Sequence, residues 1–132
     1  MKKSLLIVIS LVAVFFFAST NQVIAQWSVD VHWIDDDCSC ANITSKVLDW
    51  EIRKVSDNSL LASGSMDVTT VTPPQTLSDT DNVEADELYK VCAKVQYFEA
   101  SIDPLCCQDS RCITIDSEKL INGGETVYLF LN

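Results

Sequence analysis

Six cysteines are the residues of this 132-residue chain whose type and spacing could do the most chemistry. A cysteine can pair in a disulfide, bind a soft metal ion as a thiolate, or act as a redox group. The spacings are short, with one Cys-x-Cys pair and, much later, one Cys-Cys pair. The six are Cys38, Cys40, Cys92, Cys106, Cys107 and Cys112.

Metal binding and redox catalysis fit these spacings less well than disulfides do. Cys38 and Cys40 with Cys106 and Cys107 could hold Zn²⁺ or Cu⁺. However, the sequence has no paired Cys-x-x-Cys knuckles and no Cys-x-x-Cys at a helix start. We therefore predict disulfides, with no metal and no other cofactor.

The beginning of the chain favours the disulfide interpretation because it resembles an export signal. Lys2 and Lys3 precede an apolar run over residues 5–18, and a small-residue pattern ends at Ala25. We predict a signal peptide over residues 1–25 and a single domain over residues 26–132. An uncleaved membrane anchor is the alternative, but the run is shorter than the roughly 20 residues a span needs. We expect a secreted or periplasmic protein, free of the membrane after cleavage.

Charge narrows the range of partners. The net charge is −10, and removal of two lysines with the leader would bring it to −12. Such a chain repels the phosphate backbone of nucleic acids and the surface of anionic membranes. Cations and basic partners remain compatible with it.

Alternation of apolar and polar residues predicts an all-β protein. The expected strands cover residues 27–33, 48–53, 60–68, 75–78, 89–97, 111–116 and 125–131. Residues 79–82 are expected to form a polar loop, and residues 116–121 one helical turn at most. About seven short strands in one domain predict a two-sheet sandwich.

Three segments carry a resemblance to a known architecture. The run VEADELYKVCAKV, with Tyr89, resembles the tyrosine corner and following strand of fibronectin type III and immunoglobulin-like domains. WSVDVHW, with Trp33 at its end, resembles the tryptophan-bearing second strand of those domains, and DWEIRKV resembles the strand after it. The resemblance implies a disulfide-stabilised, immunoglobulin-like β-sandwich; a transthyretin-like sandwich is the alternative arrangement. Such folds carry many functions, so the resemblance implies none.

The strand pattern also indicates which cysteines can meet. Cys92 shares the polar face of its strand with Lys90 and Lys94, and Cys112 lies opposite the inward Ile113. If these strands are antiparallel neighbours, a cross-strand Cys92–Cys112 bridge follows. The other four cysteines are expected in two loops that meet at one end of the sandwich, tied by two bridges.

Five residues are the candidate binding residues, namely Asp35, Asp36, Asp37, Tyr128 and Phe130. The aspartates lie in a loop after the first strand, where rigid sandwiches often carry recognition residues. The last strand is apolar on both faces, so its aromatic residues either pack internally, which we favour, or face a partner. Loop carboxylates could also bind Ca²⁺, as could a second acidic group over residues 79–87, although solvated loops are the simpler interpretation.

Catalysis finds little support in the sequence. His32 is the single histidine, and no nucleophile–base–orienter pattern accompanies it. Asn42 begins a glycosylation sequon, which we expect to be unmodified in a bacterial host.

We predict no catalytic residues and a secreted, non-catalytic binding or adhesion domain that contacts protein or glycan through loops or an edge strand. The alternatives are an accessory subunit of a cell-surface assembly and a calcium-binding module.

Overall fold

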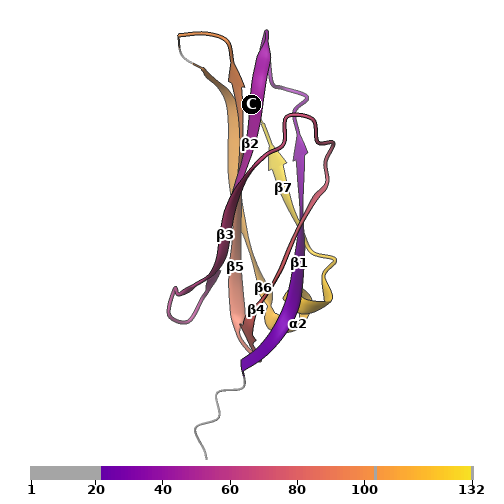
Figure 1. Cartoon of the computed structure of the whole chain (residues 1–132), viewed down its shortest axis with the longest axis vertical. Helices are drawn as coiled ribbons and strands as arrows, with labels where there is room; N and C mark the ends of the chain where they lie inside the picture. The colour runs from indigo at the N-terminus through magenta and orange to yellow at the C-terminus, as the bar shows by residue number, and fades with distance from the viewer. Residues whose placement is uncertain (1–21, 103, 132) are drawn as a thin grey trace, which may run out of the picture.

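The computed structural model describes residues 22–102 and 104–131, which form a two-layer β-structure (Figure 1). The elements in chain order are β1 (Gln22–Ile34), β2 (Ile43–Lys54), β3 (Leu60–Asp67), β4 (Gln75–Glu84), β5 (Leu88–Glu99), β6 (Leu105–Asp116), α2 (Ser117–Asn122) and β7 (Thr126–Phe130). One sheet has the order β4-β1-β7 and the other the order β3-β2-β5-β6. The predicted two-sheet, all-β architecture of about seven strands is confirmed.

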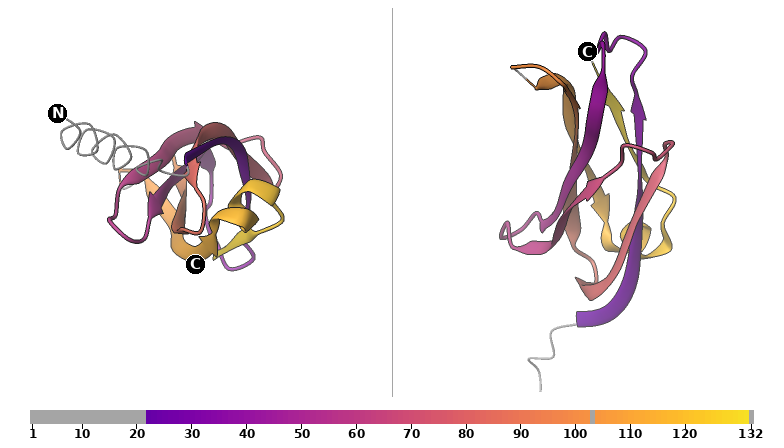
Figure 2. Two further views of the ribbon diagram at one scale, coloured as in Figure 1. Left: turned by 90° about the horizontal axis from the view of Figure 1, so that it is seen from below. Right: turned by 45° about the horizontal axis from the view of Figure 1, so that its top comes forward.

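The two sheets face each other (Figure 2), and the side chains of the core lie between them. β1 contributes Trp27, Val29, Val31 and Trp33, which are all buried, while the residues between them face outward. From the other sheet, alternate residues of β2 and β5 point back at them and are also buried; these include Leu48, Ile52, Val91 and Val95. Burying one such side chain contributes about 1.5–3 kcal/mol, so this alternation is what joins the sheets.

β4 is longer than the sequence predicts, because the expected polar loop over residues 79–82 is part of the strand. β4 pairs antiparallel with β1 from Gln75 to Glu84 without a break in register. Asp81 is tolerated there because its Oδ2 accepts a hydrogen bond of 2.8 Å from Trp27 Nε1. Because the residues in this stretch are polar, apolar alternation did not predict that the strand continues through them.

β6 also begins earlier than predicted, at Leu105 rather than Arg111. It pairs antiparallel with β5 as far as Phe98, with one register shift near that end. Cys106 and Cys107 therefore lie on a strand and not in a loop. The cause is the long partner strand, whose free backbone groups extend pairing beyond the predicted end.

β7 occupies the outer position of the three-stranded sheet beside β1 and runs parallel to it. Val127, Leu129 and Leu131 point into the core and are buried. Tyr128 and Phe130 point outward and are 53% and 43% exposed. The internal packing of these two aromatic residues, which we favoured from the sequence, is therefore wrong.

The helix α2 exceeds the single turn expected. Asp116 caps its start, with Oδ1 accepting from the Lys119 backbone N–H at 2.8 Å. Gly123 ends it with φ of 73°, a conformation that glycine adopts at low cost. Leu120 is fully buried, so this short helix covers one end of the core.

The tyrosine-corner contact implied by the resemblance is present. The Tyr89 hydroxyl accepts a hydrogen bond of 2.8 Å from the Glu84 backbone N–H, five residues upstream. Burial raises the pKa of Tyr89, which keeps the hydroxyl neutral. Asp86 turns the chain between them with φ of 58°, which aspartate tolerates better than most residues.

Most of the predicted signal peptide lies outside the described residues. The described part starts at Gln22, and Gln22 to Ala25 pair through their backbones with the last residues of β4. Cleavage after Ala25 would therefore remove the first four residues of β1. No helix within the described ranges is long and apolar enough to cross a membrane.

Candidate functional site

The two exposed aromatic side chains of β7 lie beside outward-facing residues of β1. Tyr128 is opposite His32, and Phe130 is opposite Ile34. The rings of His32 and Tyr128 are 5.6 Å apart between centroids and tilted by 42°. The Arg111 guanidinium carbon lies 5.1 Å from the centroid of the Phe130 ring, which is within the range of a cation–π contact.

The three aspartates lie in the β1–β2 loop, residues 35–42, which begins directly after Ile34 at the end of β1. The Leu131 backbone N–H donates to the Ile34 carbonyl at 2.9 Å, so the end of β7 lies next to the start of the loop. Asp36 and Asp37 are exposed and form no ion pair within the described part of the chain. The structure thus joins the predicted binding residues of the loop and of the last strand into one region.

Asp35 has a structural contact that its neighbours lack. Its Oδ2 accepts a hydrogen bond of 2.7 Å from the buried Tyr97 hydroxyl. Burial of the hydroxyl, together with the adjacent carboxylate, raises the pKa of Tyr97 well above its usual range. Asp35 therefore anchors the loop to β5, which leaves Asp36 and Asp37 to face solvent.

We define the β1–β7 surface as the outward side chains of both strands plus the free carboxylates of the loop. Its members are His32, Ile34, Asp36, Asp37, Tyr128 and Phe130. These residues lie almost a hundred positions apart in the sequence. Only the parallel pairing of β7 with β1 brings them together.

The backbone edge of β7 is partly open. Glu125 and Leu131 exchange hydrogen bonds with β1, so the N–H and C=O groups of Thr126, Tyr128 and Phe130 point the other way. The Phe130 N–H donates to Asp109 Oδ2 of β6 at 2.8 Å. The backbone groups of Tyr128 have no such partner within the described residues, so they are open along this edge of the sheet.

Asp109 and Arg111 were not predicted to belong to this region. Arg111 Nε donates to Asp109 Oδ2 at 3.0 Å. Burial alone would raise the pKa of Asp109, but the bonds from the Phe130 N–H and Arg111 outweigh it and lower the pKa. Asp109 and Arg111 share a face of β6 with Cys107 and Ile113, and because both are charged, apolar alternation gave no signal that β6 starts before Arg111.

All six cysteines are paired. Cys92 and Cys112 are directly opposite each other on β5 and β6 and form the predicted cross-strand disulfide. The other two disulfides join the β1–β2 loop to β6, and we call them the loop bridges. They connect Cys38 to Cys107 and Cys40 to Cys106, with Cα–Cα distances of 6.0 and 5.9 Å. The predicted tie between the two cysteine-bearing segments is confirmed, and disulfides of this kind indicate a compartment outside the cytoplasm.

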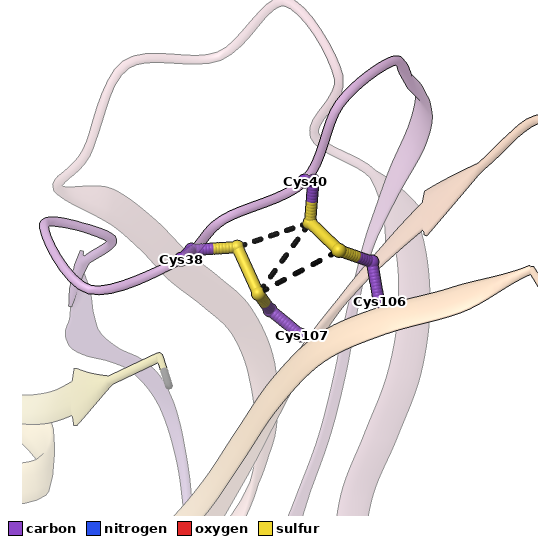
Figure 3. Close-up of side chains that lie close together, drawn as sticks. All are labelled: Cys38, Cys40, Cys106 and Cys107. Carbon is purple, nitrogen blue, oxygen red and sulfur yellow. Dashed lines mark hydrogen bonds between the residues drawn. A yellow bond between two sulfur atoms is a disulfide. The ribbon is translucent and has the colours of Figure 1, made fainter.

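The two loop bridges are stacked against each other (Figure 3). Between the bridges, the non-bonded sulfurs of Cys38 and Cys40 are 3.1 Å apart, and those of Cys40 and Cys107 are 3.4 Å apart. All four sulfurs lie within 4.8 Å of one another. Within residues 22–102 and 104–131, this is the one group of three or more metal-ligand side chains that converges.

The acidic residues considered for Ca²⁺ do not form such a group. Two residues of the second acidic stretch have other partners. Asp81 accepts from Trp27, and Glu84 pairs with Lys54 at 3.1 Å. Asn42 of the sequon is exposed, and its carbonyl accepts from the Ala100 N–H at 3.4 Å.

Comparison with known proteins adds little to this description. No family model matches the chain, and no curated protein matches it. One similar solved structure is an alternative pilotin from the type II secretion system of Vibrio cholerae, with 13% identity and a TM-score of 0.49. The match covers 83% of this chain and 96% of the pilotin. Membership of the fibronectin type III or immunoglobulin families is therefore a resemblance and not a finding.

Proposed function

We propose that this chain is an exported, non-catalytic binding domain whose β1–β7 surface holds a basic, extended segment of a partner protein. The observation that carries the proposal is the convergence of exposed aromatic rings, free carboxylates and open backbone groups at one end of the three-stranded sheet. Each of these features has a matching group on an extended basic peptide.

The backbone edge supplies affinity without demanding a particular sequence. An added strand would hydrogen-bond to the free N–H and C=O groups of Tyr128, as in other cases of strand addition. Asp109 occupies the N–H of Phe130, which limits the length of pairing. This carboxylate also protects the edge against uncontrolled pairing with other chains.

The side chains supply the preference for a basic partner. Lysine or arginine side chains on the added strand would reach Asp36 and Asp37 and lie over the ring of Tyr128. The Arg111–Phe130 contact, a guanidinium against an aromatic ring of this surface, supports the proposal. The net charge of −10 adds a long-range attraction that raises the rate of association.

A non-catalytic role is part of the proposal. The chain's one histidine packs its ring on Tyr128 at the binding surface. If the chain holds a partner protein in this way outside the cytoplasm, it acts as an accessory subunit. The binding domain and the accessory subunit considered from the sequence are then the same function. A glycan partner would use the aromatic rings but not the backbone edge. The experiment below distinguishes a glycan partner from a protein partner.

The test uses the oxidised, exported protein and a short synthetic peptide of alternating lysine and valine. The comparison probes are a glutamate–valine peptide, the lysine peptide N-methylated at alternate backbone amides, and a panel of neutral oligosaccharides. We expect the lysine peptide to bind. We expect N-methylation, and separately the Tyr128→Ala/Phe130→Ala change, to weaken binding about tenfold or more, which corresponds to about 1.4 kcal/mol.

Matched controls lie at the other end of the sandwich. Leu60 and Leu88 are as exposed as the aromatic residues, at 51% and 48%, so Leu60→Ala/Leu88→Ala should leave binding unchanged. Equal binding by the Tyr128→Ala/Phe130→Ala variant would refute the surface. Binding of an oligosaccharide but not of the peptide would refute the choice of a protein partner.

A further inference from the structure

Four sulfur atoms converge where the β1–β2 loop meets β6. Cys38 and Cys40 come from the loop, and Cys106 and Cys107 from neighbouring positions of one strand. The non-bonded sulfurs of Cys106 and Cys107 are 3.9 Å apart. The sulfur of Cys40 lies 3.1 Å from that of Cys38 and 3.4 Å from that of Cys107. These three distances are marked by dashed lines in Figure 3.

The non-bonded separations, unlike the two disulfide bonds, are comparable to the edges of a tetrahedral thiolate site. With zinc–sulfur bonds of about 2.3 Å, the edges of the sulfur tetrahedron are about 3.8 Å. The non-bonded separations already approach that value. Reduction would let the bonded sulfurs move apart toward it by side-chain rotation, without a shift of either backbone segment.

Contacts that do not involve sulfur hold both segments in place. The Cys38 N–H donates to the Asp35 carbonyl at 3.0 Å, and the Ala41 N–H donates to Glu99 Oε2 at 3.1 Å. The Tyr97–Asp35 hydrogen bond adds a third anchor. On the other side, β6 is fixed by its long pairing with β5. These contacts would keep the four thiols together after the disulfides are broken.

We propose that the reduced form of this cluster is a binding site for a single soft d¹⁰ cation, with Zn²⁺ as the reference ion and Cu⁺ as a second ion of the same class. A dithiol reductant supplies two electrons and two protons to each disulfide, and its own two sulfurs become a disulfide. One Zn²⁺ then replaces the four thiol protons, which pass to solvent.

Burial is consistent with uptake of an ion at this place. Cys107 is buried at 4% exposure, whereas the other three cysteines are half-buried, so an ion can approach from the loop side. The Cys92–Cys112 disulfide is elsewhere on β5 and β6 and takes no part. The metal would hold residues 35–42 against β6 in reducing conditions, as the disulfides do in oxidising ones.

The experiment uses the exported chain with Cys92→Ser/Cys112→Ser, so that every remaining thiol belongs to the cluster. The protein is reduced with dithiothreitol under anaerobic conditions, freed of reductant and titrated with Zn²⁺ against a chromophoric chelator. Co²⁺ serves as a spectroscopic probe of tetrahedral thiolate ligation. We expect one ion per chain, tetrahedral Co²⁺ absorption and a rise in melting temperature with Zn²⁺ but not with Mg²⁺.

The further change Cys40→Ser/Cys106→Ser leaves two ligands and should weaken binding about 100-fold or more, which corresponds to about 2.7 kcal/mol. Near-UV circular dichroism of the buried tryptophans reports folding throughout. Three results would overturn the proposal: a folded, reduced chain that takes up no Zn²⁺, equal uptake by the two-ligand variant, or a reduced chain that unfolds and is not refolded by Zn²⁺. All binding of the lysine peptide is measured on oxidised protein, so the two proposals fail separately.

Discussion

The stacked disulfides should stabilise the fold in a strongly non-additive way. Each closes a long loop, with sequence separations of 69 and 66 residues. In the chain-entropy model either bridge alone contributes about 4.4 kcal/mol. Once one bridge is present, however, the second closes a ring of only five residues, Cys38 to Cys40 plus Cys106 and Cys107, and contributes about 2 kcal/mol.

The expected costs follow from this geometry. Cys38→Ala/Cys107→Ala should lower the free energy of unfolding by about 2 kcal/mol, and so should Cys40→Ala/Cys106→Ala. Replacing all four cysteines should cost about 6.5 kcal/mol, which exceeds the sum of the two pairs by about 2.4 kcal/mol. The excess arises because either remaining bridge restricts the same segments in the unfolded chain.

Guanidinium unfolding without reductant, followed by tryptophan fluorescence, measures the three free energies. Mass spectrometry of each variant confirms that no thiol is free. As a control, Cys92→Ala/Cys112→Ala removes an isolated bridge of 20-residue separation, which should cost about 3.3 kcal/mol whether or not the stacked pair is intact. A cost of 4 kcal/mol or more for either single bridge, or additive costs, would refute the reasoning.

Three further variants test the packing and the hydrogen bonds. Tyr89→Phe should cost about 1–2 kcal/mol in urea unfolding because it leaves the Glu84 N–H without its partner, and an unchanged midpoint would contradict this. Gly64→Ala should cost about 1–2 kcal/mol by thermal unfolding, because the new Cβ would lie 2.7 Å from the Trp50 ring. No loss of stability would show that the ring moves away, and a loss that Trp50→Phe does not reduce would show that the ring contact is not its cause. Asp109→Asn should cost about 1 kcal/mol at neutral pH. The carboxyl pKa is lowered by folding, so this contribution is present above its ordinary pKa of 3.8 and disappears as the pH falls through the lower folded value, and a difference that persists in acid would argue against it.

The apolar alternation of the sequence was sufficient to predict the all-β class, most of the strands and the core positions of β1 and β5. That pattern is local, because period-two alternation requires only that one face of a strand be buried. The same alternation placed Cys92 and Cys112 on outward faces, which was enough to predict their bridge. It could not reveal β4 beyond Ser78, because Asp79 to Asn82 are polar and enter the strand only through backbone pairing with β1.

The pairing partner of each strand was decided by the tertiary structure. Nothing in residues 125–131 indicates a parallel neighbour, yet that neighbour sets which side of β7 is open and leaves Tyr128 and Phe130 exposed. The sequence indicated that Cys38 and Cys40 could reach Cys106 and Cys107, but only the register of β6 selects the pairing observed. Contacts between distant segments depend on how whole strands are stacked, and that information is not contained in the residues of either segment alone.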